Sequence, residues 1–156
     1  MELLGHFHPK IVHFPVALIL AGAVFELIGR AVSLEWWRKA AFAMLIAGVL
    51  GAGLAVASGL QAEEPVEHQG VPDTAIEAHE EVALLTLYLG IAAVLARLLA
   101  GRLRGGRALV SGLALVLHLA AAVTVGIAAH RGGLLVYDHG AAVKIDGQPV
   151  RSGPEH

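Results

Sequence analysis

Four long apolar segments dominate the chain, and short polar connections separate them. They cover approximately residues 11–30, 40–60, 80–100 and 108–130. Each holds roughly 18–22 residues, enough to cross about 30 Å of hydrocarbon as an α-helix. The pattern predicts an all-α integral membrane protein, an up-down four-helix bundle formed by residues 1–130. Residues 131–156 are expected to form a short tail outside the membrane.

Composition supports a membrane environment. Hydrophobic residues make up 56% of the chain and charged residues only 15%, against about 25% charged residues in a soluble domain. We therefore expect the lipid bilayer to be a direct partner. The net charge of -2 gives no reason to expect nucleic acid binding. The chain has no cysteine, which excludes thiolate metal sites and covalently attached haem.

A stripe of small residues runs along the second segment: Gly48, Ala52, Ala55 and Gly59. Such a stripe lets another helix or a flat ligand approach the backbone. Helix packing is the simpler interpretation. Stripes left exposed could also support a homodimer.

Basic residues predict the orientation. Seven of the eleven Lys and Arg residues lie in the first and third connections, whereas the middle connection is acidic. The positive-inside rule then places those two loops in the cytoplasm and both termini outside. At the cytoplasmic end of the first segment, Glu26 and Arg30 lie one helical turn apart and can pair.

Histidines follow the same asymmetry. With this topology, eight of the nine lie on the outer side: His6, His8, His13, His68, His79, His130, His139 and His156. The ninth, His118, falls near the middle of the membrane. We expect it to form a hydrogen bond across the bundle, to Thr86 or to a backbone carbonyl.

The outer histidines suggest a cofactor site. Two neutral imidazoles from facing helices commonly hold a b-type haem in a helical bundle. His13 and His79 are the best axial pair, because the first and third helices are diagonal in an up-down bundle. His130, His8 and His139 are the alternatives.

The tail is expected to cover this site. Gly132-Gly133 could turn the chain sharply at the membrane surface, which would bring Tyr137 and His139 back over it. Residues 134–137 could form a short strand, and Asp146-Gly147 suggests a small hairpin.

Two other interpretations remain open. A bare copper or zinc ion also binds histidine clusters, and the histidines could simply be structural. No arrangement of residues typical of a hydrolase stands out. An electron carrier or accessory subunit is therefore favoured over a stand-alone enzyme.

The chain contains several further motifs: His8-Pro9-x-x-Val12-His13-Phe14-Pro15, Ser58-Gly59 near the end of the Gly-rich second segment, Ala78-His79, Arg97 and His130-x-Gly132-Gly133-x-Leu135-Val136-Tyr137-x-His139-Gly140-x-x-Val143. They resemble the bacterial family called domain of unknown function 2231, over residues 6 to about 145. The resemblance implies a four-span protein of the bacterial inner membrane. Members of that family also occur joined to c-type cytochrome domains, which favours haem and electron transfer. We expect a periplasmic redox carrier or respiratory complex subunits as partners.

Overall fold

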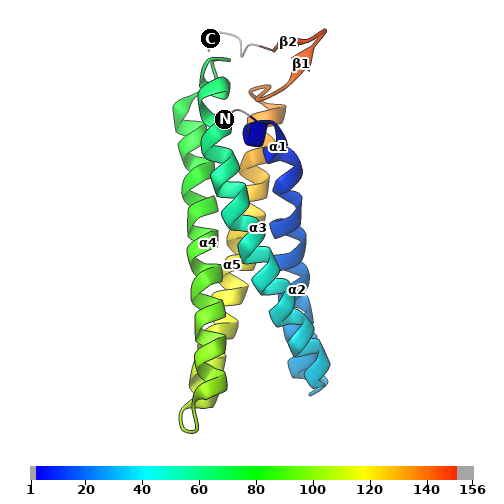
Figure 1. Cartoon of the computed structure of the whole chain (residues 1–156), viewed down its shortest axis with the longest axis vertical. Coiled ribbons are helices and arrows are strands. Elements are labelled where there is room, and N and C mark those ends of the chain that lie inside the picture. Colours follow the sequence, from blue (N-terminus) through cyan, green and yellow to red (C-terminus); the bar gives the residue numbers. More distant parts are fainter. Residues whose placement is uncertain (1–2, 151–156) are drawn as a thin grey trace.

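The computed structural model describes residues 3–150 of the 156-residue chain. Long helices form almost all of it (Figure 1), so the predicted all-α membrane bundle is confirmed. The elements are α1 (Leu3–Ile11), α2 (His13–Ala31), α3 (Glu35–Glu67), α4 (Asp73–Arg102), α5 (Arg107–Tyr137), β1 (Lys144–Ile145) and β2 (Gln148–Pro149).

Helices α1 and α2 form one rod, so four rods in all are long and apolar enough to cross a membrane. Each packs against the next, α5 also packs against α2, and α2 is therefore diagonal to α4. The hairpins α2–α3 and α4–α5 are the most extensive contacts. Figure 1 shows α1 and the strands at one end, called here the β end. Loops 32–34 and 103–106 lie at the opposite end, called here the loop end.

Large apolar side chains face outward along the rods, as a lipid-facing surface requires. Leu54 is 64% exposed and Leu109 is 79% exposed. Small residues fill the interior instead: Ala41, Ala93 and Ala121 are fully buried. Close backbone approach thus holds much of the bundle together, with a few large side chains such as Ile19 and Leu45 also buried and many others facing outward.

The predicted small-residue stripe lies on the packed face of α3. Gly48, Ala52 and Ala55 are buried. A Cβ added at Gly48 would lie 2.7 Å from Cγ1 of Ile19 on α2. At Gly48 the stripe therefore serves helix packing, which is the simpler of the two interpretations given above.

We expect Gly48→Ala to lower the stability of the bundle by about 1–3 kcal/mol, the usual cost of overpacking a core. Gly53→Ala in the same helix is the matched control, because nothing lies within 4 Å of its added Cβ. The measurement is the unfolding midpoint in detergent. Equal effects of the two substitutions would show that Gly48 is not in tight contact.

Helix ends differ from the sequence expectations. The first rod begins at Leu3, well before residue 11, and α3 continues through Pro65 to Glu67. Helix α5 runs through Gly132-Gly133 to Tyr137, so the predicted turn and the predicted strand at residues 134–137 are wrong. Glycine weakens a helix by about 0.5–1 kcal/mol, which packing against α4 offsets.

The predicted hairpin is confirmed. Strands β1 and β2 pair antiparallel, with Ile145 opposite Gln148. Asp146 and Gly147 both adopt positive φ, at 53° and 79°. That is the backbone of a type I′ turn, which Asp-Gly sequences favour.

A buried ionic cluster joins the rods toward the loop end. Glu26 on α2 is fully buried and pairs with Arg30, as predicted, at 2.9 Å, and with Arg97 of α4. Arg30 also donates to the backbone oxygen of Ser111 on α5, at 2.9 Å. Arg97 donates to the backbone oxygen of Arg38 on α3, at 2.8 Å. One carboxylate and its two arginines thus connect all four rods.

Candidate bis-histidine site

Two histidines from different hairpins meet near the β end. The rings of His8 on α1 and His79 on α4 have centroids 6.5 Å apart, and their planes are nearly perpendicular, at 87°. Both side chains are half-buried. The two rings thus meet between the rod formed by α1 and α2 and the diagonal rod, α4.

The His8 ring is fixed by helix α3. Its Nδ1 lies 3.0 Å from the backbone oxygen of Ala55 and 3.0 Å from Oγ of Ser58. The Ser58 hydroxyl is itself buried and donates to the same Ala55 oxygen at 2.9 Å. A carbonyl oxygen can only accept, so Nδ1 of His8 carries the proton and donates it.

The His79 ring is fixed in the same way by helix α5. Its Nδ1 donates to the backbone oxygen of Ala128 at 3.0 Å. The neighbouring residue is held too, because Arg131 donates to the backbone oxygen of Ala78. Both histidines are therefore Nδ1–H tautomers when neutral, with a bare lone pair on Nε2. Within residues 3–150, neither Nε2 has a hydrogen-bond partner.

A glycine lies under each ring. A Cβ at Gly59 would be 3.2 Å from Cε1 of His8, and a Cβ at Gly132 would be 3.1 Å from Cε1 of His79. Gly132 was expected to turn the chain. Its role is instead to let the His79 ring approach α5 closely.

We predict that Gly132→Val displaces the His79 ring and destabilises the bundle by about 1–3 kcal/mol. Gly126→Val, also in α5, should have little effect because its Cβ position is open. Thermal unfolding in detergent compares the two variants. If Gly132→Val unfolds at the same temperature as Gly126→Val, the close packing of His79 on α5 is refuted.

His118 forms its hydrogen bond through the other ring nitrogen, Nε2. It is 2% exposed, and its Nε2 lies 3.3 Å from the backbone oxygen of Ile19 on α2. The predicted bond across the bundle to a carbonyl is confirmed, while the Thr86 hydroxyl donates to Val82 of its own helix. Because its Nε2 is the donor, the lone pair of neutral His118 is on Nδ1, and the ring as a whole is buried in the bundle, where it serves helix packing.

The structure does not bring His13 to the pair. His13 is exposed, since it lies two residues before the buried Pro15 and hence about 200° away on the helix. His8 lies seven residues before Pro15, on the buried seam that continues through Gly22 and Gly29. That spacing of seven is a sequence signal that favours His8 over His13.

The other predicted site residues lie elsewhere. His130 is exposed and Tyr137 is 87% exposed. His130 stands twelve residues after His118, and steps of four drift by about 40° each on a helix, so it turns away from the core. His139 is half-buried and lines a cavity of about 250 Å³ beside Ala78 and Arg131.

The described residues contain no group of three or more His, Asp or Glu side chains that could hold a metal ion. A structural zinc site, which takes four protein ligands, is therefore not assembled within residues 3–150. The site that these residues do provide is a pair of imidazoles.

Comparison with known families agrees with the fold. The family described as "Predicted membrane protein (DUF2231)" matches residues 6–145. No curated protein and no solved structure matches the chain. The match includes both histidines of the pair and all four membrane-spanning rods. The chain belongs to the DUF2231 family of predicted membrane proteins.

Proposed function

We propose that this protein binds a b-type haem between His8 and His79 and transfers electrons at the membrane surface. The observation that carries the proposal is the matched pair of tautomers. Both Nδ1 atoms are held by backbone carbonyls, which leaves Nε2, the usual iron ligand, available on both rings.

The distance between the rings of His8 and His79 supports the same pair of ligands. Two metal–imidazole bonds of about 2.0–2.1 Å, each ending on a ring of roughly 1.1 Å radius, would separate two ring centroids by about 6.3 Å. The observed separation is 6.5 Å. Gly59 and Gly132 let these two rings lie close to the backbones of α3 and α5. His8 and His79 are therefore the residues that would hold the haem iron, and the iron would supply one-electron redox chemistry.

The protein would set the properties of the haem through these ligands. When bound, haem iron stores and releases one electron by cycling between its ferric and ferrous forms. The carbonyls of Ala55 and Ala128 would hold both imidazoles in one orientation during that cycle. Ligation would also clamp the hairpin α2–α3 to the hairpin α4–α5, whose mutual contacts are less extensive than those within each hairpin.

Orientation determines where the electrons go. The loop end carries most of the basic residues, so the positive-inside rule places the histidine pair near the outer face. We propose a bacterial inner-membrane protein with its β end toward the periplasm. A periplasmic redox carrier or a subunit of a respiratory complex would exchange electrons with it there.

Copper is the second candidate. Imidazole nitrogens also bind copper, and the site offers two of them, although within residues 3–150 they belong to no group of three or more His, Asp or Glu side chains that could hold a metal ion. Two ligands could hold a copper ion in the same gap. Metal content distinguishes the two candidates.

The test is the absorption spectrum and metal content of the protein purified in mild detergent. We expect a Soret band, a reduced-minus-oxidised α band at the usual b-type position, and about one iron per chain. A colourless protein that contains copper would support the second candidate. A colourless protein without metal, even after haem is supplied, would exclude both.

A further inference from the structure

A second site lies at the loop end, far from the histidine pair. A pocket of about 470 Å³ is bounded by Gly29, Arg30, Ser33, Glu35 and Arg38. These residues come from the end of α2, the loop that follows it and the first turn of α3. The pocket therefore opens where a membrane-spanning helix pair meets the membrane surface.

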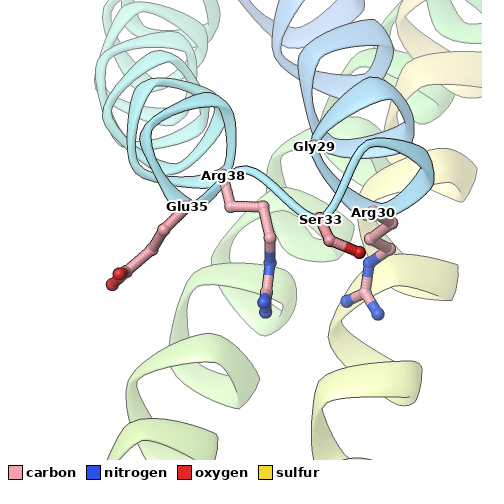
Figure 2. Close-up of a pocket in the computed structure, with 5 residues that line it drawn as sticks. All are labelled: Gly29, Arg30, Ser33, Glu35 and Arg38. Carbon is pink, nitrogen blue, oxygen red and sulfur yellow. The ribbon is translucent and has the colours of Figure 1, made fainter.

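Two arginines supply positive charge to the pocket. Figure 2 shows the side chains of Arg30 and Arg38 extended in the same direction, with Ser33 between them. The Glu35 carboxylate points away from both guanidinium groups. It pairs instead with Lys39, at 3.3 Å on the exposed surface of α3.

Arg38 carries one of the buried polar atoms that the described part of the fold leaves without a partner; the Gln61 side-chain oxygen is another. The Arg38 Nε is buried and has no hydrogen-bond partner among the described residues. Its Cγ packs where a side chain on residue 29 would be, 2.7 Å from a Cβ added at Gly29. Gly29 thus seats the stem of Arg38 against α2. A buried N–H without an acceptor is costly, so the Arg38 guanidinium would gain by turning toward an anion in the pocket.

The surroundings favour an anion as well. Helix α3 begins at Glu35 without a side-chain cap on its first turn, so its free N–H groups add positive potential. Besides Glu35, the loop end has the carboxylate of Glu26, which already pairs with Arg30 and Arg97. The loop end as a whole has seven cationic side chains against these two carboxylates: Arg30, Arg38, Lys39, Arg97, Arg102, Arg104 and Arg107.

Aromatic residues indicate the depth of the pocket. Trp36 and Trp37 directly precede Arg38, and their rings stack with centroids 4.4 Å apart. Phe25 contacts the Trp37 ring at 4.6 Å. Tryptophan beside basic residues is typical of the layer of lipid headgroups. The anionic group that this layer offers to the two arginines is the phosphate of a lipid headgroup.

We infer that Arg38, Arg30 and Ser33 bind the phosphate of an anionic phospholipid headgroup. The fork of a guanidinium matches phosphate oxygens. The Ser33 hydroxyl can donate to a third oxygen. Neither the histidine pair nor a bound haem takes part, so this inference stands apart from the proposed function.

Lipid retention tests the inference. The detergent-purified protein is incubated with mixed micelles of phosphatidylglycerol and phosphatidylcholine, and bound lipid is counted by native mass spectrometry. We expect wild-type protein to retain phosphatidylglycerol selectively. Arg38→Gln should lower that retention about tenfold, the equivalent of one charge-assisted hydrogen bond.

Arg104→Gln is the matched control, because it removes the same charge from the same end but lies in the exposed loop outside the pocket. It should retain lipid as wild type does. Equal losses in the two variants would overturn the inference, since non-specific attraction would then explain the binding. Glu35→Gln gives an independent check that does not depend on how Arg38→Gln folds. Removing this exposed carboxylate from the pocket rim should raise retention, and no change would count against the site.

Inorganic phosphate distinguishes the source of the ligand. Titration into lipid-free protein, followed by tryptophan fluorescence, should show weak binding at most. Tight phosphate binding that Arg38→Gln abolishes, without preference for phosphatidylglycerol, would show that the pocket takes a soluble phosphate and would overturn the lipid assignment.

Discussion

His8→Ala and His79→Ala should each abolish haem binding, while His13→Ala and His130→Ala should leave it intact. The first two remove an imidazole whose Nε2 is available to iron. The other two alter exposed side chains outside the pair. The measurement is the ratio of haem to protein after purification in detergent. Even loss of an outer-shell partner weakens metal sites by about 10–100-fold, so loss of a direct ligand should reduce affinity further.

In these histidine variants, a loss of haem caused by misfolding must be distinguished from a loss caused by the missing ligand. Each variant is therefore also compared by circular dichroism and by its elution from a sizing column. A folded His79→Ala protein that retains full haem would refute the assignment of the ligands. Loss of haem in His13→Ala at the level seen for His8→Ala would equally contradict it.

Glu26→Ala should destabilise the bundle more than any other single substitution considered for this protein. It removes the fully buried carboxylate that pairs with Arg30 and Arg97. Two arginines would then remain inside the bundle without their counter-ion, which typically costs about 3–5 kcal/mol. Reversible unfolding in mixed detergent micelles measures the change in the free energy of unfolding.

Glu35→Ala provides the comparison. Glu35 pairs with Lys39 at the same spacing of four residues, but both side chains are about three-quarters exposed, at 77% and 74%. Surface pairs of this kind contribute about 0–1 kcal/mol. Similar losses for Glu26→Ala and Glu35→Ala would mean that the Glu26 cluster does not hold the four rods together.

The overall architecture could be predicted from sequence because membrane spans need long apolar segments. The four segments appeared as four rods, and the Asp146-Gly147 hairpin also formed as predicted. The ends of the rods could not be predicted from hydropathy alone. Gly132 and Pro65 are helix breakers in isolation, yet both lie within helices here. Gly132 stays helical because α5 packs against α4, and Pro65 is tolerated because it lies in the last turn of α3.

The candidate site was predicted only in part. Sequence reasoning identifies both His79 and His8, but it favours His13 over His8 because hydropathy places the start of the first helix near residue 11. Once the helix begins at Leu3, its buried seam passes through His8 instead. The roles of Ala55 and Ala128 could not be predicted, because any residue carries a backbone carbonyl. Only the packing of the helices shows which carbonyl meets which ring.

Electron paramagnetic resonance of the oxidised, haem-loaded protein tests the central claim most directly. Two imidazoles make ferric haem low-spin, and planes near perpendicular, as the 87° between His8 and His79 indicates, give a strongly anisotropic signal. We predict that signal for wild-type protein and its absence from His8→Ala and His79→Ala. A high-spin signal, which a single histidine ligand would give, or no haem signal at all would contradict the account.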